Sequence, residues 1–119
     1  MTDKEKLQGT WVLTGLERAG KTAPRADLAK LRLKLVFRGD RVTFEYPDHT
    51  EVGIYKLQTN QDVKTIDVVT ASNVSQGIYR LEGDSLRICG VPSGEARPAE
   101  LTTTPGTKEV LFVLKRQKP

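Results

Sequence analysis

The sequence contains one cysteine, one histidine and one tryptophan in 119 residues. A single cysteine, Cys89, excludes an internal disulfide and a thiolate metal cluster. A single histidine, His49, leaves general acid–base catalysis with few candidate groups, and no paired carboxylates share an identifiable face. The composition therefore predicts that the protein is not an enzyme and that it holds neither a metal nor a cofactor.

Long apolar runs are also missing from the sequence. No segment approaches the roughly 20 apolar residues that a membrane-spanning helix requires, and residues 1–5 are not followed by the apolar stretch of a signal peptide. We expect no membrane association. The chain as written is expected in the cytoplasm, and it would be exported if a signal peptide had been removed ahead of Met1. Its length predicts a single domain over residues 1–119.

The charge is unevenly distributed along the chain. Nineteen Lys and Arg against fifteen Asp and Glu leave a net charge of +4. Because aromatic residues alternate with the basic ones, a solvated outer face is favoured over a nucleic-acid surface, and an acidic protein partner remains an alternative. The basic residues gather in one segment: Arg18, Lys21, Arg25, Lys30, Arg32, Lys34, Arg38 and Arg41.

What the sequence does contain is apolar alternation with a period of two, which predicts an all-β protein. Eight or nine short strands at this spacing indicate an antiparallel barrel or a sandwich. One helical turn is expected at 24–30, where Pro24 precedes Leu28. The predicted strands are 10–18, 31–38, 41–47, 50–58, 64–71, 74–82, 85–91 and 109–116, with 99–103 as a short additional one.

Two hairpins can be aligned residue by residue. In FRGDRVTF the Gly39-Asp40 pair suits a two-residue turn with glycine at its first central position. The hydrophobic pattern agrees with the register that this turn imposes. That register pairs Arg38 with Arg41, Phe37 with Val42, Leu35 with Phe44 and Leu33 with Tyr46.

The second hairpin, LEGDSLRI, contains four letters, G-D-S-L, that also open the nucleophile block of a family of serine esterases. With Gly83-Asp84 as the turn, Leu81 faces Leu86 and Ser85 is simply the first residue after the turn. An esterase serine needs a histidine base, and no histidine follows this one. We therefore interpret the motif as a hairpin and not as a catalytic site.

The two ends of the chain resemble those of lipocalins. Gly9-Thr10-Trp11 is similar to the G-x-W signature that opens those proteins, and Arg116 is similar to the arginine of their last strand. Together with LKLVFRGDRVTF, GIYRLEGDSLRIC and VLFVLKR, these motifs resemble the small lipocalin-like domain recurrent in planctomycete proteins, an uncharacterised bacterial family. The resemblance implies an eight-stranded up-and-down barrel in which Trp11 and Arg116 are neighbours that close the cylinder.

Such a barrel is either filled by its own side chains or left with a cavity for one small apolar ligand, and the sequence leaves both open. In the ligand-binding alternative, Phe44 belongs to the apolar wall, and Tyr46, Tyr55 and Tyr79 supply its polar tips. The expected interior residues are Trp11, Leu33, Leu35, Phe37, Phe44, Tyr46, Tyr55, Tyr79, Leu81, Ile88 and Phe112.

Arg80 and Arg87 form an unusual pair, because the second hairpin places these like charges directly opposite one another. Three explanations remain open: an acid such as Glu82 shares them, they are splayed into water, or together they hold an anionic ligand.

Two further groups are candidate sites. Asp48, His49 and Glu51 are close in sequence but make an incomplete metal shell. Cys89 faces Ile78 and is expected to be a half-buried, unreactive thiol.

These observations leave two hypotheses of different classes. The first is a non-enzymatic lipocalin-like module that binds a small hydrophobic ligand in its barrel. The second is a protein-interaction or structural domain with a packed barrel, whose basic outer strands meet an acidic partner. The oligomeric state is not indicated by either.

Overall fold

The computed structural model describes residues 1–118 and contains nine strands and two short helices. The elements in chain order are α1 (Asp3–Leu7), β1 (Gly9–Arg18), β2 (Lys21–Thr22), α2 (Arg25–Leu31), β3 (Lys34–Arg38), β4 (Arg41–Glu45), β5 (Thr50–Gln58), β6 (Thr65–Thr70), β7 (Val74–Glu82), β8 (Ser85–Pro92) and β9 (Val110–Arg116).

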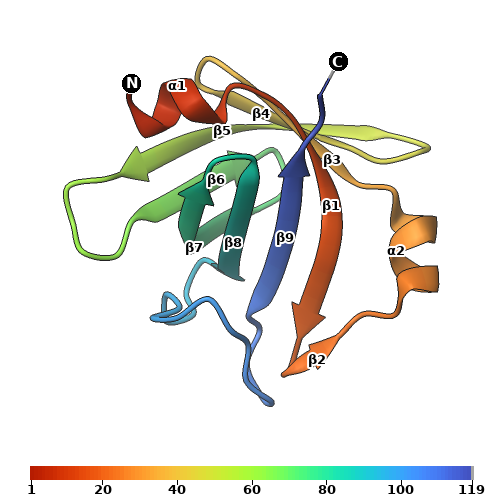
Figure 1. The fold of residues 1–119 in the computed structure, drawn as a ribbon. Helices are drawn as coiled ribbons and strands as arrows, with labels where there is room; N and C mark the ends of the chain where they lie inside the picture. The colour runs from red at the N-terminus through yellow and green to blue at the C-terminus, as the bar shows by residue number, and fades with distance from the viewer. Residues whose placement is uncertain (119) are drawn as a thin grey trace.

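The strands form one antiparallel sheet that closes on itself. The order is β2-β1-β3-β4-β5-β6-β7-β8-β9, and β1 pairs with β9 as well as with β3. Figure 1 shows β1 and β9 side by side, with β2 extending the lower end of β1. Eight strands thus make the closed up-and-down barrel that the sequence predicts, and β2 is one strand more.

Both predicted hairpin registers are confirmed, although the first ladder ends at Lys34 and Glu45, so that Leu33 and Tyr46 are not paired. Phe37 pairs with Val42 and Leu35 with Phe44 in the first, and Leu81 pairs with Leu86 in the second. The first central residue of each turn is a glycine with positive φ, +60° at Gly39 and +57° at Gly83, a conformation that side chains resist. These turns fix which side chains of four strands face inward.

Closure brings the two ends of the chain together, as expected. Trp11 is opposite Arg116 in the β1–β9 ladder, and the Arg116 guanidinium lies 4.4 Å from the centre of the indole ring. The same guanidinium donates to the Gln8 carbonyl at 3.0 Å and to the Lys6 carbonyl, and its Nε is 3.2 Å from an Asp84 carboxylate oxygen. One side chain therefore joins β9 to β1, to α1 and to the β7–β8 turn.

Two strand predictions are wrong in part. The strand predicted at 31–38 begins only at Lys34, because α2 continues to Leu31 and Arg32 then adopts a left-handed φ of 45° that ends the helix. No strand forms at 99–103. Leu101, in that segment, packs instead on an outer cluster of Ile78, Cys89 and Leu111.

Helix α1 was not predicted, although its start carries a recognisable signal. Thr2 and Glu5 form a capping box, in which the Thr2 hydroxyl accepts from the Glu5 backbone and the Glu5 carboxylate accepts from the Thr2 backbone. The helix lies across one end of the barrel (Figure 1). Its last residue, Leu7, is fully buried and accepts a 2.9 Å hydrogen bond from the Trp11 indole through its carbonyl.

The interior of the barrel is a single apolar core. Every residue expected to point inward belongs to it, so the assignment of strand faces from the sequence is correct. Its buried members are Leu7, Trp11, Leu13, Leu33, Leu35, Phe37, Val42, Tyr55, Ile66, Tyr79, Leu86 and Leu114.

Candidate ligand cavity

The core does not fill the barrel completely. A cavity of about 310 Å³ lies inside it and reaches the end opposite α1, where the β6–β7 turn and the residues before β9 are found. A volume of this size lies at the small end of the range for ligand sites. The cavity is lined by Leu35, Phe37, Val42, Phe44, Ile66, Val68, Asn73, Val74, Ser75, Gly77, Ile88, Gly90, Val91, Pro92, Lys108, Val110 and Phe112.

Two glycines on neighbouring strands help to leave this space empty. Gly77 and Gly90 are directly opposite in the β7–β8 ladder and both line the cavity. A Cβ at Gly77 would lie 2.5 Å from the Cys89 carbonyl oxygen, so the close approach of the strands requires glycine there. A Cβ at Gly90 would meet nothing nearer than the Gln76 oxygen at 3.7 Å. Packing therefore does not require glycine at position 90, and the absence of a side chain there leaves space in the cavity.

The other end of the barrel is sealed by polar contacts between α1 and the strands. Asp3 accepts a 2.7 Å hydrogen bond from the Tyr79 hydroxyl and a 2.9 Å ion-pair contact from Lys64 Nζ. The Lys64 hydrogen bond lowers the pKa of Asp3 below its ordinary value, and burial raises the pKa of Tyr79. The carboxylate and the phenol are therefore held ionised and neutral respectively, which suits the hydrogen bond between them.

A second set of contacts completes this seal. The Tyr55 hydroxyl donates to the Gly39 carbonyl at 2.7 Å and accepts from Gln8 Nε2 at 3.1 Å. Gln8 in turn accepts from the Gly39 amide at 2.7 Å. In the same region Lys4 pairs with Asp40. These bonds attach α1 and the residue that follows it to the β3–β4 turn and to β5, so the cavity opens at one end.

The structure assigns different places to the residues expected at a ligand. Phe44 lines the cavity. Tyr55 and Tyr79 do not line it, because their hydroxyls point to the sealed end. Tyr46 is also outside the lining and stacks on His49, with ring centres 4.5 Å apart and planes 10° apart. The three tyrosines are therefore distributed around the barrel and do not form a common polar end for the cavity.

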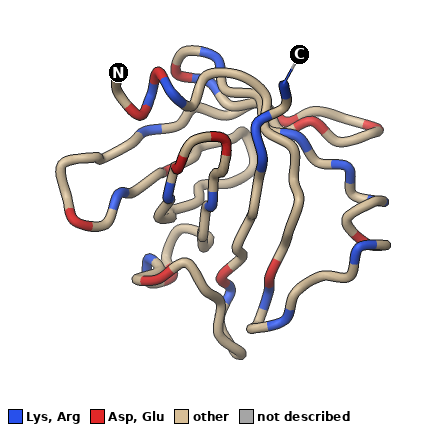
Figure 2. Tube along the Cα trace, in the orientation of Figure 1, with Lys and Arg blue, Asp and Glu red and all other residues tan. Residues whose placement is uncertain are grey.

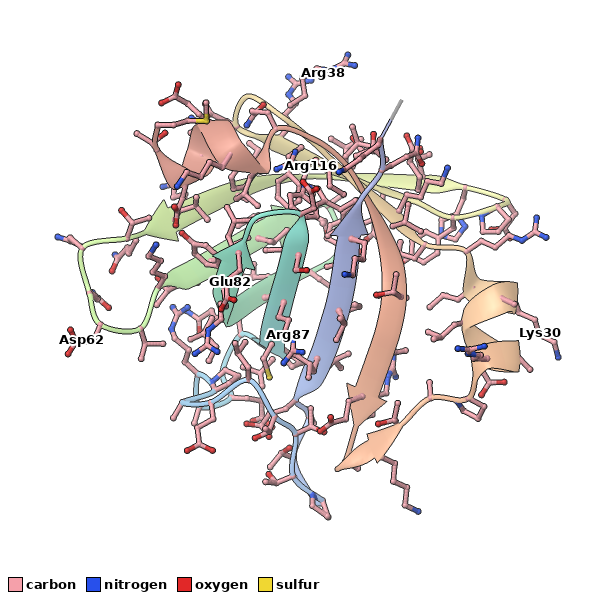
Figure 3. All side chains as sticks on the ribbon, in the orientation of Figure 1. Lys30, Arg38, Asp62, Glu82, Arg87 and Arg116 are labelled. Atoms are coloured by element: carbon pink, nitrogen blue, oxygen red, sulfur yellow. The ribbon has the colours of Figure 1, made fainter. Side chains whose placement is uncertain are left out.

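Arg80 and Arg87 are opposite one another, as the hairpin register predicts, but on the outer face of the barrel. Arg80 Nε lies 3.7 Å from a Glu82 carboxylate oxygen, and both of these side chains are largely exposed. Figure 3 shows Glu82 and Arg87 on the outside of the hairpin. The contact between Arg80 and Glu82 supports the first of the three explanations, a neighbouring acid. Neither arginine lines the cavity.

Three polar residues of the cavity were missed by sequence analysis: Asn73, Ser75 and Lys108. Lys108 was placed outside the last predicted strand. A signal was present, since Lys108, Val110 and Phe112 continue the period of two that marks the inward face of β9. The turn residue Asn73 had no comparable signal.

The other candidate groups are not arranged around a reactive centre. Cys89 is completely buried, its thiol contacts the Thr102 carbonyl at 3.6 Å, and burial raises its pKa to about 11. His49 is hydrogen-bonded to Asp48 at 2.7 Å. In residues 1–118 no group of three or more His, Cys, Asp or Glu side chains is placed to hold a metal ion.

A small apolar surface lies on the outside of the same barrel. Val52, Ile54 and Val69 are each about half exposed, and Ile54 on β5 is directly opposite Val69 on β6. This outer valine surface faces away from the core and offers a shallow alternative to the cavity for apolar molecules.

No described helix is both long enough and apolar enough to cross a membrane. Neither the protein-family models, nor the curated proteins, nor the solved structures with which the chain was compared match it.

Proposed function

We propose that the protein is a non-enzymatic, lipocalin-like binding module that takes one small, largely apolar ligand into its barrel. The observation that carries the proposal is the cavity of about 310 Å³, sealed at one end and lined almost entirely by apolar side chains. Burial of apolar ligand surface in such a site is favourable by about 25 cal/mol per Å².

The size and shape of the cavity limit the ligand. Its volume corresponds to roughly ten water molecules, and hence to a molecule of about ten non-hydrogen atoms. The wall is made of strand residues in a closed sheet, so it is largely preformed. We therefore favour a short aliphatic chain or a single ring over an extended lipid.

A series of straight-chain alcohols tests the proposal, with amide chemical shifts of the labelled protein as the readout. Each buried methylene contributes about 0.8 kcal/mol, so the dissociation constant should fall about fourfold for each added carbon. The improvement should end at about eight to ten carbons, where the chain fills the cavity. Shifts should be confined to residues such as Phe44, Val68 and Phe112, which line it.

Two results would contradict the proposal. One is the absence of saturable shifts for every chain length. The other is a set of shifts centred on the outer valine surface, which would show that apolar molecules adhere to the outside. Native mass spectrometry of protein purified from its own source provides an independent check, because a retained ligand of small mass is expected.

A second function, contact with an acidic protein, is favoured by one observation. None of the eight basic residues between Arg18 and Arg41 makes an ion pair with another residue of the described chain. Figure 2 shows basic positions recurring from β2 through α2 to β3. Binding of this kind should weaken steeply with salt and should be lost in an Arg32→Glu, Lys34→Glu variant. Neither added salt nor this double substitution should affect the binding of a neutral ligand in the cavity.

A further inference from the structure

The proposed function does not say which end group the ligand carries. The polar atoms of the barrel restrict this choice. No buried side-chain nitrogen or oxygen in the described residues lacks a hydrogen-bond partner. A polar group of the ligand would therefore find no unpaired side-chain atom in the depth of the cavity, and burying it there would be unfavourable. The polar end must lie at the open end.

The open end carries a single charge among the residues that line the cavity. Asn73 and Ser75 are neutral, and Lys108 is the only ionisable side chain of the lining. Lys108 is exposed and makes no ion pair with any residue from 1 to 118. Its ammonium group is thus available to a ligand.

The acids of this region have partners of their own. Glu109, the next residue, accepts hydrogen bonds from Thr104 and Thr107. Glu17 accepts from the backbone and hydroxyl of Thr103, and Glu51 accepts from Ser72. None of these carboxylates lines the cavity, so the charge at its opening is positive.

From this we infer that the ligand is a short amphiphile with an anionic end, a carboxylate in the simplest case, and that Lys108 is the residue that selects this end. The apolar chain occupies the space beside Gly90 and Phe112, and the carboxylate lies at the opening near Lys108, where Asn73 and Ser75 offer additional donors. This inference rests on the proposed function, because it requires that the cavity be occupied.

Octanoate, octan-1-ol and octylammonium form a matched set of probes, with the same chain and a negative, neutral or positive end. In a Lys108→Met variant, which removes the charge and keeps an unbranched apolar side chain one atom shorter, octanoate should bind about threefold to fivefold more weakly than in the wild type. Octan-1-ol should bind equally to both proteins, and octylammonium should bind more tightly to the variant. The loss for octanoate should shrink between about 0.01 M and about 1 M salt.

Lys115→Met serves as the control variant, since Lys115 is on β9 as well but does not line the cavity. The inference is overturned if Lys108→Met leaves octanoate binding unchanged or if Lys115→Met weakens it equally, while octan-1-ol still binds in the cavity. Failure of all three probes to bind the wild-type protein would instead refute the proposed function, and the inference with it. Amide spectra of both variants show whether each is folded.

Discussion

At the scale of single residues, Arg116 connects several separate parts of the fold. It stacks on Trp11, donates to two carbonyls at the start of the chain and contacts Asp84 in a hairpin turn. A lysine could not reproduce these contacts, because only the planar guanidinium combines stacking with several directed donors. One side chain therefore reinforces the closure that the β1–β9 ladder makes.

Replacement of Arg116 with methionine should lower the free energy of unfolding by about 2–3 kcal/mol, because the carbonyls of Lys6 and Gln8 lose charged donors and the indole loses its cation. Denaturant unfolding measures the effect. Lys115 is next to Arg116 on β9 and is exposed, so Lys115→Met should change the free energy of unfolding by no more than about 0.5 kcal/mol. Equal effects of the two substitutions would refute a special role for Arg116.

Cys89 illustrates how burial decides reactivity. Its thiol is inaccessible and its pKa is raised to about 11 by desolvation, so it should be almost entirely protonated at neutral pH. A thiol reagent such as DTNB should react with the native protein at a rate limited by unfolding and should react at once in denaturant. Rapid reaction of the native protein would show that the 93–109 segment opens readily over the outer cluster.

At the scale of elements, α1 acts as the closure of the barrel. Only five residues long, it could not be stable alone. It is held by burial of Leu7 and by the Asp3 contacts with Lys64 and Tyr79. The helix thus depends on the barrel that it seals.

The Asp3 contacts should make this seal sensitive to acid. Folding lowers the pKa of Asp3 through Lys64, so its contribution is complete above the ordinary value of 3.8 and is lost as the pH falls below that value. Hydrogen exchange should show the α1 amides losing protection in this range. Asp3→Asn should cost about 1–3 kcal/mol at neutral pH and remove much of the acid dependence.

The exposed loop residue Asp62 provides the control for that substitution, since it makes no ion pair with a described residue. Asp62→Asn should leave both stability and acid dependence as they are. If Asp3→Asn behaved in the same way, the Asp3 contacts would contribute nothing to holding α1 on the barrel.

At the scale of the whole molecule, the cavity exists because some inward positions of the barrel, such as Gly90, carry no side chain. Gly90→Leu should place a side chain in the empty space and weaken octan-1-ol binding at least tenfold. The protein should remain as stable or gain about 0.5–1 kcal/mol, because glycine is unfavourable within a strand. Titration and denaturant unfolding measure the two effects.

Gly77→Ala is the informative comparison, because its added Cβ would meet the Cys89 carbonyl. It should cost about 1–3 kcal/mol through displacement of the strand backbone. Ser75→Leu, at another lining position, offers a second way to fill the cavity. Undiminished alcohol binding in folded Gly90→Leu and Ser75→Leu variants would place the ligand elsewhere.

The sequence by itself determined the barrel, its inward faces and the neighbouring positions of Trp11 and Arg116. The inward faces follow from signals that are local, namely apolar alternation with a period of two and glycine-containing two-residue turns. The closed barrel and the nearness of Trp11 to Arg116 were expected only from the resemblance of the two chain ends to lipocalins, because the strand pattern alone fits a sandwich as well. The capping box at Thr2 and the alternation through Lys108 were of the same kind and could have been recognised. The predicted start of β3 is wrong because Arg32 adopts a left-handed conformation, which is uncommon for arginine and has no signal in the sequence.

Only the tertiary structure decided what the inward residues do. Tyr55, Tyr79 and Phe44 share the barrel interior, yet the first two close one end and the third lines the cavity. Whether a barrel is full or hollow depends on how side chains from opposite strands fill the same space, and where α1 lies depends on contacts such as that of Asp3 with Lys64, 61 positions away. Such packing is set by residues distant in sequence, and no local pattern records it.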